Sequence, residues 1–182
     1  MTSQYSSNND KSLAMLVGFP YSGKTAWVKE KLSHPIEMRL LMGLDPNSLN
    51  PFSVVGLNHE LHAIAQAKGL TYNDLLGQEK HRAVAAEAMR VSLIDALQRG
   101  EDIIVDDINL TKKSREKILN LVPQGYRRVC ISFEDVSESL IYQRMEAHHA
   151  VAPKALTLSQ MASLIRHFDP PTNREFDAII YV

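Results

Sequence analysis

The sequence has few of the residues that form disulfides, transmembrane helices or surfaces for non-specific binding to nucleic acid. One cysteine among 182 residues, Cys130, excludes an internal disulfide and any metal site made of several cysteines, and its apolar neighbours favour a place in the core. No apolar run approaches the roughly 18 to 20 residues that cross a bilayer. A formal net charge of −1 disfavours a protein that coats nucleic acid, because such binding needs many cationic contacts with phosphate. We expect no membrane partner.

The composition is that of an ordinary globular protein, with 45% hydrophobic and 23% charged residues. A chain of this length suits one domain with a substantial core. The polar start, rich in serine and asparagine, lacks the basic and apolar regions of a signal peptide. We therefore expect a flexible polar tail over residues 1–11, one domain over residues 12–182, and a cytoplasmic location.

The most informative stretch is GFPYSGKT, residues 18–25, which matches the GxxxxGK[ST] pattern of a phosphate-binding loop. It follows the apolar run 13–17, which is typical of a buried strand, and precedes helix-forming residues at 26–32. A strand that delivers a glycine-containing turn to a helix start directs backbone N–H groups into one hollow, where the helix dipole also favours negative charge. The sequence therefore predicts a nucleotide-binding site.

Each residue type in this loop suits contact with a nucleotide. Gly18 permits the turn, and Gly23 lets the backbone approach the phosphates. Lys24 can reach the β and γ phosphates, and the Thr25 hydroxyl can bind Mg²⁺. These roles predict ATP and Mg²⁺ as cofactors. The residues expected at the nucleotide are Gly18, Tyr21, Ser22, Gly23, Lys24, Thr25 and Ala26.

Strand patterns alternate with helix patterns along the rest of the chain. The expected strands are 13–17, 52–55, 102–107, 128–133 and 178–182, and the expected helices are 26–32, 57–67, 72–97, 111–121, 137–147 and 158–167. Prolines and a glycine between residues 35 and 51 indicate a broken region, partly loop. Such alternation predicts an α/β fold, a single-domain P-loop NTPase with a central parallel sheet and helices on both faces.

Two acids, Asp106 and Asp107, follow an apolar run that suits a buried strand. Ligands of an open α/β sheet gather at the carboxyl ends of its strands, so both acids should lie near the phosphate-binding loop. Either can hold Mg²⁺ or its waters, or bind the acceptor hydroxyl. Asp106 is the first candidate for the metal, together with Thr25. The alternative is that one acid only caps the following turn with Asn109.

A basic cluster follows these acids. Taken alone, it is interpreted as a solvated helix face in preference to a short track for phosphates. The residues concerned are Lys112, Lys113, Arg115 and Lys117, followed by Arg127 and Arg128.

At this point the chain resembles the polynucleotide 5′-hydroxyl kinases, a family of P-loop kinases with relatives among the DNA kinases of bacteriophages. The resemblance rests on the loop at 18–25, the stretch ALQRGEDIIVDDIN at 96–109, and the stretch HFDPPTNREFD at 167–177. In that family an acid ends the strand after the long helix, and an acid-proline-threonine turn precedes the last strand. The resemblance implies a kinase with a helical lid, and a host-cell cytoplasm if the chain is viral.

The family also implies a proton acceptor, and here the chain departs from the pattern. The family uses an aspartate just after the second strand as the base for the acceptor hydroxyl, and the matching residue is Asn58. An amide cannot take the proton. His59 or Glu60 can do so if the backbone shifts by one residue, since both side chains accept protons at neutral pH.

A second departure concerns the lid, where the family has basic residues, at least one of them an arginine that reaches the transferred phosphate. The resemblance assigns this role to Arg144, while His148 and His149 stand near the place of another arginine. A histidine is only partly charged at pH 7, so its stabilisation of the phosphate would be weaker. A surface position before a loop is the equal alternative for these histidines.

The leading hypothesis is an ATP- and Mg²⁺-dependent kinase that acts on a hydroxyl of a nucleic acid, with DNA favoured. The acceptor is a 5′-hydroxyl end or a hydroxymethylated pyrimidine within DNA. The residues expected to carry catalysis are Lys24, Asp106, Asp107, Arg144, Glu60 and His59. Alternatives are a small-metabolite or nucleoside kinase, which fits the near-neutral charge, and a catalytically weak nucleotide-binding module.

Overall fold

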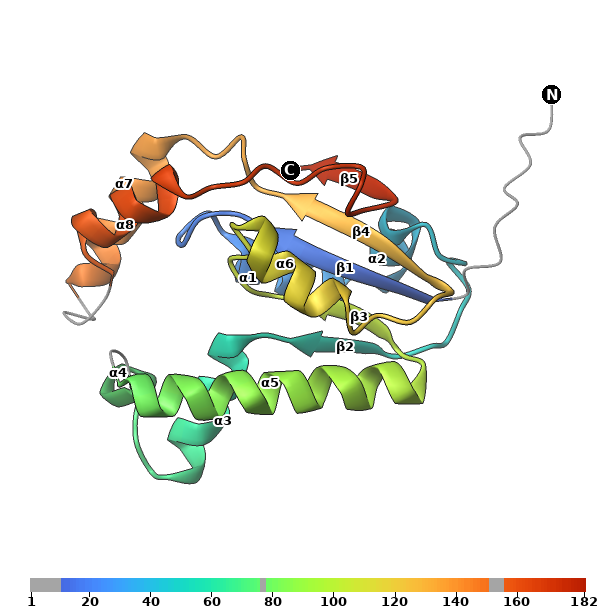
Figure 1. Cartoon of the computed structure of the whole chain (residues 1–182), viewed down its shortest axis with the longest axis horizontal. Coiled ribbons are helices and arrows are strands. Elements are labelled where there is room, and N and C mark those ends of the chain that lie inside the picture. The colour runs from blue at the N-terminus through green and yellow to red at the C-terminus, as the bar shows by residue number, and fades with distance from the viewer. Residues whose placement is uncertain (1–10, 76–77, 151–155) are drawn as a thin grey trace.

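The computed structural model describes residues 11–75, 78–150 and 156–182 (Figure 1). Its strands there are β1 (Lys11–Val17), β2 (Phe52–Val55), β3 (Asp102–Val105), β4 (Tyr126–Ser132) and β5 (Ala178–Tyr181). Its helices are α1 (Lys24–Leu32), α2 (Pro35–Met42), α3 (Leu57–Ala67), α4 (Tyr72–Leu75), α5 (Glu79–Arg99), α6 (Lys112–Leu119), α7 (Glu138–His149) and α8 (Leu158–Arg166). Residues 1–10 of the expected tail lie outside this part, and Lys11 already belongs to β1.

The strands form one parallel sheet in the order β2-β3-β1-β4-β5. Strand β1 lies at its centre, paired with β3 and over its whole length with β4. Central parallel strands are buried on both faces, which is why β1 and β3 are almost continuously apolar. The expected single-domain α/β fold with a parallel sheet is confirmed.

Alternate residues of β1 face two cores. Leu13, Met15 and Val17 pack with residues of α5 and α6, while Ala14 and Leu16 pack with residues of α1 and α2. In Figure 1, α6 lies in front of the sheet and α1 and α2 lie behind it. The sheet is therefore covered on both faces, as the alternating pattern predicts.

Two groups of helices extend this core at its edges. Helices α3, α4 and the start of α5 share an apolar cluster beside the β2 edge. Helices α7 and α8 form a pair that lies beyond the end of the sheet in Figure 1, and their cluster packs against Phe19 and Tyr21 of the phosphate-binding loop. Helices α7 and α8 therefore stand where the resemblance predicts a helical lid.

The expected elements are confirmed with one correction. The region 35–51 is partly loop, as expected. Helix α2 occupies its first half, with Pro35 at its first turn and the left-handed Gly43 at its end, positions that these residues favour, and a loop continues to β2. The pattern over 72–97 is not one helix, since the structure has α4 and α5 with a separate start at Glu79. Residues 76–77 between them lie outside the described part.

The largest correction concerns Arg115, which was expected on an exposed basic face. Its side chain is completely buried, whereas Lys112, Lys113 and Lys117 of the same cluster are exposed. Arg115 stands one helical turn before the buried Leu119, so the spacing places it on the inner face of α6. Neither a solvated face nor a surface track for phosphates describes this residue.

None of the helices within residues 11–75, 78–150 and 156–182 combines the length and apolar character that crossing a membrane requires.

Cys130 gives a direct test of the core. It lies in β4 with no exposed surface, and burial raises the pKa of its thiol to about 12. Because the thiolate is the reactive form, the native protein should resist a thiol reagent such as dithionitrobenzoate at about pH 8. The same protein unfolded in concentrated urea should release close to one equivalent of product. Rapid stoichiometric labelling of the native protein would place Cys130 outside the core.

Candidate active site

The loop from Gly18 to Gly23 joins the buried strand β1 to the start of α1. Gly23 has a φ of 104°, a left-handed conformation that costs glycine little. A Cβ atom on Gly18 would stand only 2.7 Å from Cβ of Phe133, so a side chain there would displace the end of β4. Both glycines of the motif are therefore required by the backbone path.

Lys24 folds back over this loop. Its Nζ donates hydrogen bonds to the carbonyl oxygens of Gly18 at 2.8 Å and Phe19 at 2.7 Å, and lies 3.4 Å from Oγ of Ser22. Burial lowers the pKa of Lys24 to about 8, and the charges of Asp106 and Asp107 oppose that shift. An anion bound in the loop would favour the charged form of this ammonium group further.

Asp106 joins the end of β3 to the loop. Its Oδ2 accepts a hydrogen bond from the hydroxyl of Thr25 at 2.8 Å, and Nε2 of His59 lies 2.9 Å from the same oxygen. The Asp106 side chain is almost fully buried. A carboxylate and a threonine hydroxyl are hard oxygen donors, the kind that Mg²⁺ takes alongside phosphate oxygens and water. The donor set at Thr25 and Asp106 therefore fits Mg²⁺.

His59 is oriented by this contact. A carboxylate oxygen accepts hydrogen bonds, so the contact fits Nε2 as the protonated nitrogen of His59 and leaves Nδ1 as the nitrogen that can take a proton. The hydrogen bond to Asp106 raises the pKa of His59, while partial burial opposes the rise. The imidazole is thus held at the end of β3 in a defined tautomer.

Asp107 is placed differently. Its Oδ1 accepts a hydrogen bond from the backbone N–H of Ile108 at 2.7 Å, which closes the turn after β3. Burial raises the pKa of Asp107, and the Ile108 N–H is the largest opposing influence. Of the two acids, Asp106 is the one that contacts Thr25.

The other residues near the family's base position have partners other than Asp106. Asn58, at the start of α3, accepts a hydrogen bond from the hydroxyl of Tyr72 at 3.0 Å. Glu60 accepts one from the hydroxyl of Ser92 on α5 at 2.8 Å. The ring of His62 stacks on Tyr72 with centroids 4.3 Å apart. Tyr72 is a residue that the sequence analysis missed, because nothing in the pattern links it to Asn58.

The lid contributes a cation to the loop. Nη1 of Arg144 on α7 donates to the carbonyl oxygens of Tyr21 and Ser22, both at 3.0 Å. The ring of His148 lies 5.5 Å from that of Tyr21, and Nε2 of His149 contacts the carbonyl oxygen of Leu156. Arg144 is therefore the lid residue whose charge lies at the phosphate-binding loop.

A family model described as an AAA domain matches residues 13–171. No curated protein matches the sequence.

Solved structures share the fold at low identity. The first is Kti12 of Chaetomium thermophilum in complex with ADP-AlF3, at 15% identity and a TM-score of 0.61 over 93% of this chain and 88% of that chain. A chain of the Pnkp1/Rnl/Hen1 RNA repair complex shows 14% identity and a TM-score of 0.63 over 91% of this chain and 46% of that chain. Shikimate kinase of Acinetobacter baumannii shows 16% identity and a TM-score of 0.51 over 96% of this chain and 85% of that chain.

The family model and the loop at 18–25 together indicate a P-loop nucleotide-binding domain, and the solved structures show that its fold is shared with kinases. Identities of this size show the fold alone, so the roles of the individual site residues stay predictions.

Lys24→Ala should weaken nucleotide binding strongly, because it removes the ammonium group that faces the phosphates. Titration calorimetry with MgATP should show a dissociation constant raised about tenfold or more, with the midpoint of thermal unfolding close to that of the wild type. Lys29→Ala, on the exposed face of the same helix, is the matched control and should bind normally. Equal affinity in the two variants would remove Lys24 from the phosphate site.

Proposed function

The chain belongs to the AAA domain family, and from that premise we propose that it is an ATP- and Mg²⁺-dependent kinase that phosphorylates a hydroxyl group of a nucleic acid. The observation that carries the proposal is Arg144, which reaches from the lid to the carbonyls of the phosphate-binding loop. A module that only binds nucleotide has no need of a second cation at the loop, whereas phosphoryl transfer develops charge on the transferred group that such a cation stabilises.

The nucleic-acid acceptor is supported by the ordered motifs at 18–25, 96–109 and 167–177, which resemble those of the polynucleotide 5′-hydroxyl kinases. DNA is the favoured acceptor, either at a 5′-hydroxyl end or at a hydroxymethylated pyrimidine. A chain of the Pnkp1/Rnl/Hen1 RNA repair complex shares the fold, which is compatible with a nucleic-acid substrate.

In the proposed reaction the acceptor oxygen forms a bond to the γ phosphorus while the bond to the β–γ bridging oxygen breaks. ADP leaves, and the hydroxyl proton passes to a base. Lys24 exchanges its carbonyl partners for β and γ phosphate oxygens, and Arg144 stabilises charge on the transferred group. Thr25 and Asp106 would hold Mg²⁺, which neutralises phosphate charge when bound. Placement and electrostatics supply most of the rate in such transfers.

The proposed proton acceptor is His59. Asn58 is an amide that accepts a hydrogen bond from Tyr72, and the carboxylate of Glu60 accepts one from Ser92, whereas His59 contacts Asp106 itself. The hydrogen bond between His59 and Asp106 presents Nδ1 as the basic nitrogen, as a carboxylate does for a catalytic histidine. Asp107, which also follows β3, is the second candidate for the proton acceptor.

The function is tested by transfer of labelled γ phosphate in the presence of Mg²⁺. The acceptors are DNA and RNA with 5′-hydroxyl ends, end-blocked DNA that contains hydroxymethylated pyrimidines, free nucleosides and small metabolites. We expect label on a DNA acceptor, and none with Lys24→Ala. Label on a small molecule instead would establish the metabolite kinase that the near-neutral charge favours. Nucleotide binding without transfer to any acceptor would overturn the kinase assignment.

His59→Gln should lower the rate by about 10² to 10⁴, the usual contribution of a general base, with little change in nucleotide affinity. Glu60→Gln is the matched neighbour and should stay within about threefold of the wild type, because its partner is Ser92. Steady-state kinetics on the accepted substrate measure both. Asn58→Asp should raise the rate on a 5′-hydroxyl end if that end is the acceptor. A normal rate in His59→Gln would move the base to Asp107 or show that none is needed.

A further inference from the structure

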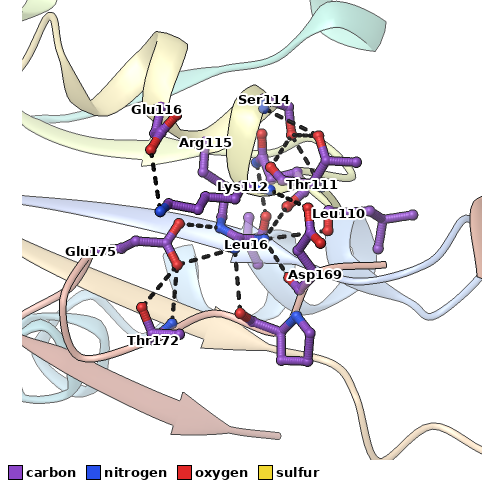
Figure 2. Close-up of polar contacts among 12 residues, drawn as sticks. Leu16, Leu110, Thr111, Lys112, Ser114, Arg115, Glu116, Asp169, Thr172 and Glu175 are labelled. Atoms are coloured by element: carbon purple, nitrogen blue, oxygen red, sulfur yellow. Dashed lines mark hydrogen bonds and ion pairs between the residues drawn. The ribbon is translucent and has the colours of Figure 1, made fainter. Parts of the chain in front are cut away.

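Arg115 is the largest completely buried side chain of the described residues, and it forms a two-pronged ion pair (Figure 2). Its Nε lies 2.8 Å from Oε1 of Glu175, and its Nη2 lies 3.1 Å from Oε2. The second carboxylate oxygen also accepts the backbone N–H and the hydroxyl of Thr172. The guanidinium is thereby fixed to the turn that precedes β5.

The same guanidinium holds backbone carbonyls of two segments. Nη1 donates to the carbonyl oxygen of Asp169 at 2.7 Å, and to those of Asn109 at 3.2 Å and Leu110 at 3.3 Å. Two further bonds join these segments, from the N–H of Asp169 to the carbonyl of Leu110 and from the N–H of Lys112 to the carboxylate of Asp169. Arg115 therefore ties the connection after β3 to the C-terminal turn 169–175.

The connection after β3 touches the phosphate-binding loop directly. The side-chain amide of Asn109 donates to the carbonyl of Leu16 in β1 at 2.8 Å. The N–H of Gly18 donates to the carbonyl of Ile108 at 3.1 Å. Asn109 has a φ of 45°, a left-handed conformation that asparagine adopts more readily than most residues. Its carbonyl is one of those that Arg115 holds.

The C-terminal turn reaches the loop by a second route. The ring of Phe168 packs on that of Phe19 with centroids 5.4 Å apart, one residue before the Asp169 carbonyl that accepts from Arg115. Both segments fastened by the guanidinium thus contact the beginning of the phosphate-binding loop, at Gly18 and at Phe19.

We propose that Arg115 is a positioning residue of the nucleotide site, which holds the start of the phosphate-binding loop in its binding shape through Asn109 and the turn 169–175. Arginine suits this task because its planar fork offers five N–H donors in a fixed geometry. Lysine offers one ammonium group and cannot span the carboxylate and the carbonyls together. The inference rests on the nucleotide-binding part of the proposed function and is independent of the acceptor.

A second buried ion pair gives the chain its own control. Nη1 of Arg39 on α2 lies 2.9 Å from Oδ2 of Asp102, the first residue of β3, whose other oxygen accepts the N–H of Ser12. This pair is equally enclosed but stands at the amino ends of the strands, away from the phosphate-binding loop. Breaking either pair removes a buried charge partner, so both variants should lose stability.

The experiment compares Arg115→Lys with Arg39→Lys by calorimetry with MgATP alone, well below the unfolding midpoint of each variant. We expect both variants to unfold at lower temperature. Arg115→Lys should raise the dissociation constant about tenfold or more, because the backbone N–H groups of the loop lose the positions from which they bind phosphate. Arg39→Lys should stay within about twofold of the wild type, and Lys24→Ala marks the loss expected when the loop itself is damaged.

Equal affinity losses in the two lysine variants, or unchanged affinity in Arg115→Lys, would show that the pair only supports the fold. If Arg115→Lys does not fold, Glu175→Asp asks the same question with the charge retained. Its shorter arm draws the guanidinium from the carbonyls of Asn109 and Leu110, so the dissociation constant should rise about fivefold, and a normal value overturns the proposal. A wild-type protein that binds MgATP but transfers no phosphate would refute the kinase and leave this inference standing.

Discussion

The parallel pairing of β1 with β3 and β4 is the constraint on which the site depends. Because parallel strands end at the same edge of a sheet, this pairing brings together Gly18 after β1, Asp106 after β3 and Phe133 after β4. Each chain segment leaves the sheet into the same small region, where Thr25 meets Asp106 and Gly18 meets Phe133. A shift of one residue in either ladder would turn the acid or the loop away from that region.

Charged groups of opposite sign lie close together in this region. The ammonium of Lys24 is held near two carboxylates and among carbonyl oxygens, and its burial is the larger influence on its proton affinity. Asp106 in turn is hydrogen-bonded to the hydroxyl of Thr25 and to the imidazole of His59, so its carboxylate has one neutral and one basic partner. Buried groups with such partners are typical of sites that handle phosphate, where ionic charge arrives with the ligand.

The sequence predicts features formed by neighbouring residues well, and contacts between residues far apart in the chain poorly. Residues 18–25 predict the loop because every part of that motif is contiguous, and the pattern at 57–67 gives the bounds of α3. Arg115 was misread because its partner Glu175 lies sixty residues away and only the folded chain brings them together. The contact of Tyr72 with Asn58 also joins separate helices, and the spacing of residues in the sequence does not predict it. Long-range polar pairs are the part that sequence patterns of this kind leave open.

The hydrogen bonds of Lys24 to the carbonyls of Gly18 and Phe19 have a bearing on selectivity. Since these carbonyls already satisfy the ammonium group, a ligand gains from it only by being a better acceptor than a peptide oxygen. A phosphate oxygen meets that condition through its charge, whereas the hydroxyls of a nucleoside do not. The contacts between Lys24 and these carbonyls therefore favour binding of polyphosphates over binding of uncharged sugars.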